Sequence, residues 1–213
     1  MLKNVLQSLS CLPRFPISIT FHQCLNIPDY TIYYKSTQVI MVSFKTLLLC
    51  ASSVLALTTV SKVKDDITKL DKKVQALTTA TSLYNGGLLA AAPLLGSLSA
   101  VYVSLLQGVT DSALLPSSIP ESDAQSLMEH VNSTLAIDNP IAVKTLEGKK
   151  ALFKAQGLDG AIVAALRMLL AGHDAFTNNV VSRIQEDDRA DAQAVTDIIA
   201  VALKEGIHSF ESS

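Results

Sequence analysis

Apolar side chains recur every three or four residues along two long stretches of the sequence, 62–84 and 159–184. This spacing places them on one face of an α-helix. After residue 57, no alternation typical of a β-strand runs for any useful length. The sequence therefore predicts an all-α fold, a bundle of five or six antiparallel amphipathic helices. The two apolar stripes consist of Val63, Ile67, Leu70, Val74, Leu77, Thr81 and Tyr84, and of Ile162, Leu166, Leu169, His173, Phe176, Val180 and Ile184.

Further helices are predicted between and after these stretches. Residues 88–106 carry almost no polar side chain. This is typical of a helix that lies in the centre of a bundle, or of one whose apolar surface is exposed for a functional reason. Asp138-Asn139-Pro140 has the pattern of a helix start, a cap residue followed by proline in the first turn. That helix is expected to stop at Gly157. The last helix is expected to place Val195, Ile198, Ile199, Ala202 and Leu203 on one side.

The first 56 residues differ in composition from the rest of the chain. They hold all three Cys residues and a net charge of +3, whereas residues 57–213 hold all nine Gly residues and a net charge of −5. Residues 41–56 combine Lys45, an apolar run and the small-residue ending Val54-Leu55-Ala56, which is typical of a signal peptide. The run is too short to span a bilayer, and the alternative is a buried core helix.

A signal peptide at this position predicts how the chain is organised. Translation is expected to start at Met41, so that residues 1–40 are an N-terminal extension outside the fold, either disordered or an artefact of the gene prediction. Cleavage after Ala56 leaves residues 57–213 as a secreted helical domain without cysteine, held together by its core alone. The triplet that begins at Asn132 is then a candidate N-glycosylation site, with Asn132 facing solvent.

Composition and motifs argue against several functional classes. The formal net charge of the chain is −2 and no long stretch is strongly basic, so a nucleic-acid binder is not expected. The sequence contains neither a Gly-x-Ser-x-Gly elbow nor a His-Glu-x-x-His motif. We therefore predict a non-catalytic protein without a metal or cofactor. An enzyme would need His130 or His173 to meet carboxylates, such as Asp174 or Glu129, in a cleft.

One segment resembles a known family. Residues 149–166 contain the pattern Lys-x-x-Phe-x-x-x-Gly-Leu, formed by Lys150, Phe153, Gly157 and Leu158. This segment resembles the fungal hydrophobic surface binding protein A family, which also contains cell-wall galactomannoprotein antigens, and the order of the predicted helices agrees over residues 57–210. The resemblance implies a secreted or cell-wall protein that is not transmembrane. It also implies adsorption to hydrophobic surfaces or, in some members, binding of fatty acids or other lipids in a central apolar pocket.

The apolar excess of residues 57–213 leaves three possibilities: a tight core, an apolar cavity, or a helix that lies on an oily interface. A cavity is expected between the helix of residues 88–106, that of residues 162–176 and the last helix. Arg167 or His173 would meet a fatty-acid carboxylate at its mouth. The alternative is a structural wall mannoprotein or antigen without a ligand, and the oligomeric state stays open. The candidate lining residues are Leu95, Leu98, Tyr102, Leu166, Leu169, Phe176, Ile198 and Ala202.

Overall fold

The computed structural model describes residues 58–212. The predicted extension 1–40 and signal peptide 41–56 lie outside the described residues. Helices make up most of the described part of the chain, and no β-strand occurs there, which confirms the predicted all-α fold. The α-helices are α2 (Val60–Leu83), α3 (Ala92–Ala113), α4 (Glu121–Ser133), α5 (Leu135–Glu147), α6 (Lys150–Ala155), α7 (Asp159–Val181) and α8 (Arg189–Glu211), with short 3-10 turns η1 (Leu89–Ala91) and η2 (Glu186–Asp188).

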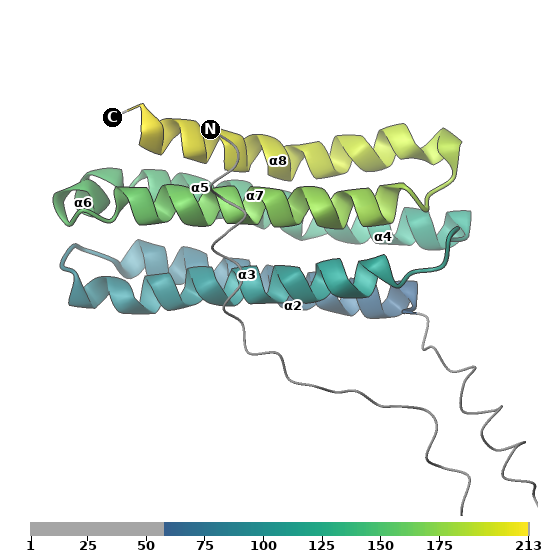
Figure 1. The fold of residues 1–213 in the computed structure, drawn as a ribbon, viewed down its shortest axis with the longest axis horizontal. Helices are drawn as coiled ribbons and strands as arrows, with labels where there is room; N and C mark the ends of the chain where they lie inside the picture. The colour runs from purple at the N-terminus through teal and green to yellow at the C-terminus, as the bar shows by residue number, and fades with distance from the viewer. Residues whose placement is uncertain (1–57, 213) are drawn as a thin grey trace, which may run out of the picture. The chain divides into compact units, whose positions relative to one another are not determined.

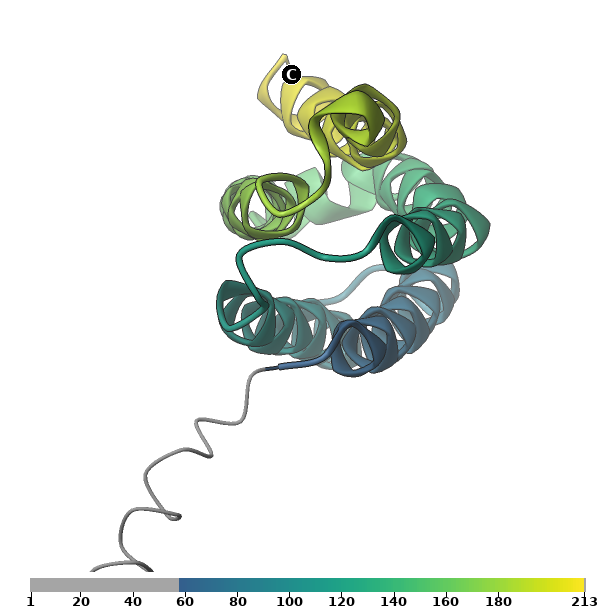
Figure 2. The ribbon, with the colours of Figure 1, turned by 90° about the vertical axis from the view of Figure 1, so that its right-hand side faces the viewer.

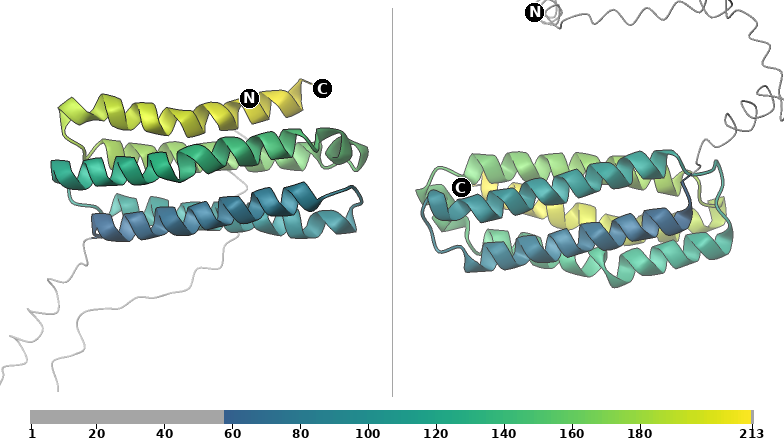
Figure 3. Two further views of the ribbon diagram at one scale, coloured as in Figure 1. Left: turned by 180° about the vertical axis from the view of Figure 1, so that it is seen from behind. Right: turned by 90° about the horizontal axis from the view of Figure 1, so that it is seen from below.

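The long helices form a closed ring around a common axis (Figures 1 and 2). α3 packs against α2 and α7, α8 packs against α7 and α5, and α5 packs against α2, which closes the ring. α4 precedes α5 along nearly the same line and contacts α2 and α8, as the view from behind shows (Figure 3). The bundle therefore encloses an axis that every long helix faces.

The two predicted apolar stripes face this axis. All their residues are buried or half-buried, from Val63 to Tyr84 and from Ile162 to Ile184. Together with α3, α5 and α8 they form a continuous hydrophobic core. Residues 58–212 therefore have the complete interior that an independently folding domain needs.

Glycine and proline lie at several helix ends, although the helix expected to run from Asp138 to Gly157 is divided into α5 and α6. Gly86 and Gly87 adopt φ angles of +99° and +94° directly after α2, and Gly157 adopts a φ angle of +67° before α7. Because glycine has no Cβ, it reaches this left-handed region without strain, and each of these turns ends a helix. Pro93 lies in the first turn of α3, where its missing N–H has no partner to lose.

One predicted helix start is wrong. α5 begins at Leu135, so Pro140 lies inside the helix rather than at its start. The side chains that suggested a cap have other partners. Asn139 Nδ2 donates to the carbonyl oxygen of Leu135 at 2.9 Å, and Asp138 Oδ2 accepts from Gln75 Nε2 of α2 at 2.7 Å. Asp138 therefore connects α5 to α2, and Asn139 bonds within α5, so neither side chain caps a helix start.

Two glycines allow neighbouring helices to approach closely. A Cβ atom on Gly172 of α7 would lie 2.7 Å from Leu105 Cδ2 of α3. A Cβ atom on Gly206 of α8 would lie 2.6 Å from Val143 Cγ1 of α5. Both distances are shorter than ordinary contacts between carbon atoms, so a larger residue at either position would force the neighbouring side chain to shift.

The outer side of α3 exposes apolar surface. Within the described residues, the stretch Leu89–Ala113 is long and apolar enough to cross a membrane, by length and composition alone, and 28% of its most apolar part is buried. One side of α3 packs against α2 and α7. On the other side, Val103 and Leu106 are 63% and 42% exposed. α3 is thus a bundle helix whose outer face presents apolar side chains to solvent.

Candidate functional site

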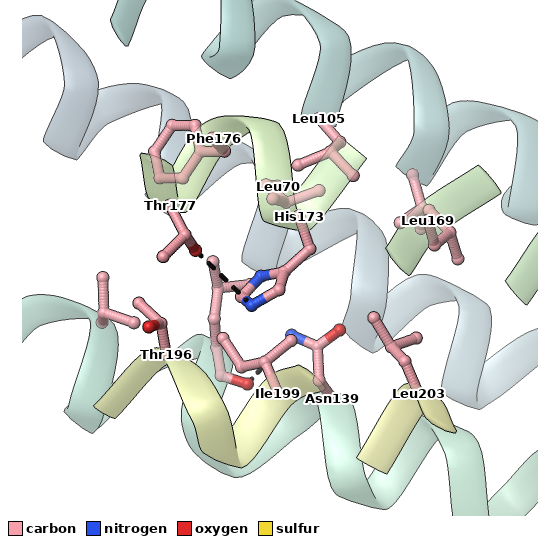
Figure 4. Close-up of a pocket in the computed structure, with 13 residues that line it drawn as sticks. Leu70, Leu105, Asn139, Leu169, His173, Phe176, Thr177, Thr196, Ile199 and Leu203 are labelled. Atoms are coloured by element: carbon pink, nitrogen blue, oxygen red, sulfur yellow. Dashed lines mark hydrogen bonds between the residues drawn. The ribbon is translucent and has the colours of Figure 1, made fainter. Parts of the chain in front are cut away.

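A small cavity lies on the axis of the ring, where six helices meet (Figure 4). Its volume is about 40 Å³. That is room for a few water molecules, because one water needs about 10–15 Å³. The lining residues are Leu70 of α2, Val101 and Leu105 of α3, Val131 of α4, Leu135 and Asn139 of α5, Leu169, His173, Phe176 and Thr177 of α7, and Thr196, Ile199 and Leu203 of α8.

A second apolar cavity of about 30 Å³ continues the first one along α7. The two share Val131, Phe176, Thr177 and Thr196 in their walls, and the second reaches Val181 at the end of α7. The half-buried ring of Phe176 is one of these shared walls. This ring packs against α3 so closely that a Cβ atom on Gly108 would lie 3.1 Å from it. Together the two adjacent cavities form the axial track of the bundle.

A few neutral polar groups interrupt the apolar walls. His173 is 8% exposed, and its Nε2 lies 3.5 Å from Thr177 Oγ1 (Figure 4). Burial lowers the pKa of His173 below its usual value. The charge of Asp174 and a hydrogen bond to the backbone of Thr196 act in the opposite direction but are the smaller effects. The imidazole is therefore neutral at pH 7. The amide of Asn139 points toward the same space. The cavity thus offers hydrogen bonds but no charge.

Three of the residues predicted to form a ligand site lie on the inner cavity. Leu169 and Phe176, both expected in the walls, line it, and so does His173, expected at the mouth. Leu95, Leu98 and Tyr102 do not reach it. They line a separate surface groove of about 240 Å³ between α3 and α7, together with Leu169, Ser99, Ala165 and Met168.

The other predicted site residues line neither space. Leu166 and Ala202 are buried in the packed core, with Leu166 beside Gly206. Ile198 is 43% exposed, because α8 turns its neighbour Ile199 toward the axis. Arg167 follows Leu166 on the helix and so points outward, where it pairs with Glu211 of α8 at 2.5 Å. Neither Ile198 nor Arg167 therefore lines the inner cavity.

Several lining residues were missed by the sequence analysis. Leu70 and Ile199 stood in predicted apolar stripes, so periodicity could have placed them at the axis. Asn139 was interpreted as part of a helix start, and its position inside α5 was needed to place it. Thr196 gives no sequence signal, because threonine is common on half-buried helix faces. Asn132, the candidate glycosylation site, is exposed on α4, as predicted.

The sequence model of the family described as hydrophobic surface binding protein A matches residues 60–182. The chain belongs to this family. No curated protein shows significant sequence similarity to it. Among solved structures, Afmp4p in complex with palmitic acid is similar with a TM-score of 0.68 at 18% identity, over 71% of this chain and 99% of that one.

Two domains of the MP1 protein of Penicillium marneffei are similar to the same degree. Ligand-binding domain 2, complexed with multiple arachidonic acids, has a TM-score of 0.67 at 21% identity, over 73% of this chain and 97% of that one. Ligand-binding domain 1, also complexed with arachidonic acids, has a TM-score of 0.66 at 20% identity, over 71% and 99%. At these identities the likeness shows a common fold.

The segment that carried the family resemblance has a structural role. Phe153 of α6 is completely buried; its ring stacks on Tyr84 with the centroids 5.0 Å apart and lies 6.1 Å from the ring of Phe210. These three rings come from α6, the end of α2 and the end of α8. The pattern around Phe153 therefore closes one end of the ring of helices and makes no contribution of reactive groups.

Proposed function

We propose that this chain is a non-catalytic carrier of fatty acids, with the acyl chain along the axis of the ring. The observation that carries the proposal is the pair of adjacent apolar cavities on that axis. Both have Phe176 and neutral polar groups in their walls. Relatives with the same fold are solved with palmitic acid and arachidonic acids. The lining of α7 from Leu169 to Val181 extends about 18 Å along the helix axis, and about 12 Å of it lies between His173 and Val181.

Binding requires the walls to move apart, because the two cavities are far smaller than a fatty acid. Each buried methylene contributes about 0.8 kcal/mol, which offsets the cost of opening the helix contacts. The carboxyl end fits beside His173, Thr177 and Asn139, which supply hydrogen bonds where water is excluded. A carboxylate there would raise the pKa of His173, and the resulting imidazolium would neutralise it.

The proposal is tested on residues 57–213 secreted from a eukaryotic host and purified without detergent. We expect fatty acid at about one molecule or more per chain in the lipid extract, identified by mass spectrometry, and displacement of a fluorescent fatty-acid probe from the delipidated protein. A protein that carries no lipid and binds no probe would contradict the carrier function.

Adsorption to hydrophobic surfaces is the second candidate function, and the exposed face of α3 favours it. Leu89, Val103 and Leu106 of this region and Met168 of the neighbouring α7 all expose apolar side chains. If neither lipid nor probe binds, adsorption through this face becomes the better explanation. A wall mannoprotein or antigen without a ligand is expected to show neither the lipid nor adsorption to an apolar surface.

We also propose that the chain is secreted and resides outside the cell or in its wall. The support is the signal-like segment 41–56 and the exposed Asn132 on α4. Expression from Met41 in a fungal host is expected to give a secreted chain whose intact mass starts at Leu57, with a glycan that an Asn132→Gln variant loses. A chain retained in the cell with residues 41–56 attached would refute this assignment.

A further inference from the structure

We propose that the acyl chain reaches the axial cavity through the groove between α3 and α7, with Leu169 as the side chain that separates groove from cavity. The inference rests on the proposed function, since it assigns the route by which that ligand enters. It goes beyond that function because it names one seam of the ring, meaning the line of contact between two neighbouring helices, as the entrance.

Leu169 forms a wall of both spaces. It lines the inner cavity of about 40 Å³ and the surface groove of about 240 Å³, and it is 7% exposed. Figure 4 shows it at the edge of the cavity, across from Leu203. A leucine side chain changes between staggered rotamers without a change of the backbone. One rotation at Leu169, with a small separation of α3 from α7, therefore connects the groove to the axis.

The groove suits an acyl chain better than a charged partner. Its walls consist of apolar side chains, the hydroxyl of Ser99 and the ring of Tyr102, and no charged side chain lines it. The exposed side chains of Val103 and Met168 extend this apolar surface to either side. A fatty acid would therefore leave water gradually, first along the groove and then along the axis.

Hydrogen bonds between α3 and α7 gather at the end of the seam away from the groove. Asn179 Nδ2 donates to the carbonyl oxygen of Val109 at 3.1 Å. Arg183, just after α7, donates to the carbonyl oxygens of Ala113 and Leu115 at 2.9 and 3.2 Å. Across the groove itself, no side-chain hydrogen bond joins the described residues of the two helices. The seam is therefore fixed at one end and held at the other by apolar contacts, which open locally at lower cost.

Other seams of the ring are less suited to opening. Lys62 of α2 bonds Asp111 of α3 at 2.6 Å, and Gln75 of α2 bonds Asp138 of α5 at 2.7 Å. Gly206 brings α5 and α8 into close contact as Gly172 does for α3 and α7, so this feature does not distinguish these two seams. The cavity that approaches the surface between α4 and α8 measures about 30 Å³, an eighth of the groove's volume. The α4–α8 seam therefore offers much less room for an acyl chain than the α3–α7 groove.

The test uses residues 57–213, which contain no Cys, so that introduced cysteines are the only reactive thiols. One double variant, Tyr102→Cys with Ala165→Cys, places thiols across the α3–α7 groove. The control variant, Thr68→Cys with His130→Cys, places them across the α2–α4 seam, where the two native side chains are 2.8 Å apart and line neither axial cavity nor the groove. All four side chains are half-buried. Each protein is measured before and after treatment with a short bis-maleimide, with crosslinking verified by mass and folding by circular dichroism.

We expect the α3–α7 crosslink to slow association of a fluorescent fatty-acid probe about tenfold or more, and the α2–α4 crosslink to change it less than about twofold. Slowing by the control crosslink, by both or by neither would overturn the proposed route. Equilibrium titration of the untreated proteins separates this result from failure of the function. If the uncrosslinked chain binds no probe, the carrier function fails and the route fails with it.

Discussion

Replacement of Thr196 with Phe is expected to weaken fatty-acid binding about fiftyfold, because the new ring would occupy the junction of the two axial cavities. Exclusion of about three methylene groups from the track removes about 2.4 kcal/mol at about 0.8 kcal/mol each, and 1.4 kcal/mol corresponds to a tenfold change in affinity. The loss of the hydroxyl itself costs little, since Thr196 Oγ1 bonds only to backbone oxygens of its own helix, Ala192 O at 3.3 Å and Gln193 O at 3.0 Å.

The measurement is a titration with the fluorescent probe, and the matched control is Thr78→Phe. Thr78 of α2 is also half-buried, and its Oγ1 also donates to a backbone oxygen of its own helix, Val74 O at 3.1 Å. It lines neither axial cavity. We expect the control to bind the probe like the parent protein. Unchanged binding by a folded Thr196→Phe variant would show that the ligand does not occupy the axial track.

The fold could be predicted from the sequence because its main signal is local. Helix period and helix ends depend on residues three to four positions apart, and both stripes, from Val63 to Tyr84 and from Ile162 to Ile184, point inward as predicted. The failure at Asp138-Asn139-Pro140 has a non-local cause. Asp138 is used by a contact with Gln75, which lies on another helix and which no local pattern reveals.

The site was harder to predict because it depends on how the helices pack. Periodicity placed Leu95, Leu98 and Tyr102 on the inner side of their helix, yet these residues meet α7 at the surface rather than at the axis. A stripe two residues wide also cannot distinguish Ile198 from Ile199, since both lie within the width of one helix face. Which of them lines a cavity is decided by the rotation of α8 in the ring.

The carboxyl group of Asp71 on α2 is buried, and only one of its two oxygen atoms has a hydrogen-bond partner among the described residues. Asp71 is 6% exposed; its Oδ2 accepts from Gln75 Nε2 at 2.9 Å, while its Oδ1 has no hydrogen-bond partner among the described residues. Burial raises the pKa of Asp71 to about 6. Part of this rise comes from the nearby Asp138, through its charge and as acceptor of a hydrogen bond from the protonated acid.

The sign of the effect follows from linkage. A carboxyl group whose pKa is higher in the folded than in the unfolded chain stabilises the fold most below its unfolded pKa of 3.8, and this stability is lost as the pH rises through about 6. Asp111 acts in the opposite direction, since its hydrogen bond with Lys62 lowers its pKa to about 2. The difference in the free energy of unfolding between an Asp71 variant and the parent protein therefore isolates the effect of Asp71 better than the pH dependence of either protein alone.

Asp71→Asn is thus expected to be more stable than the parent above pH 6, by up to about 3 kcal/mol for a shift of about two pKa units, and the difference should shrink between pH 6 and 4. Urea unfolding of both proteins at pH 4 and 7.5 measures it. Asp65→Asn, on the exposed face of the same helix, is the control and should show no such pH-dependent gain. Because an asparagine amide keeps a donor toward Asp138, a variant that loses stability at pH 7.5 would mean that Asp71 is ionised and satisfied in the folded chain.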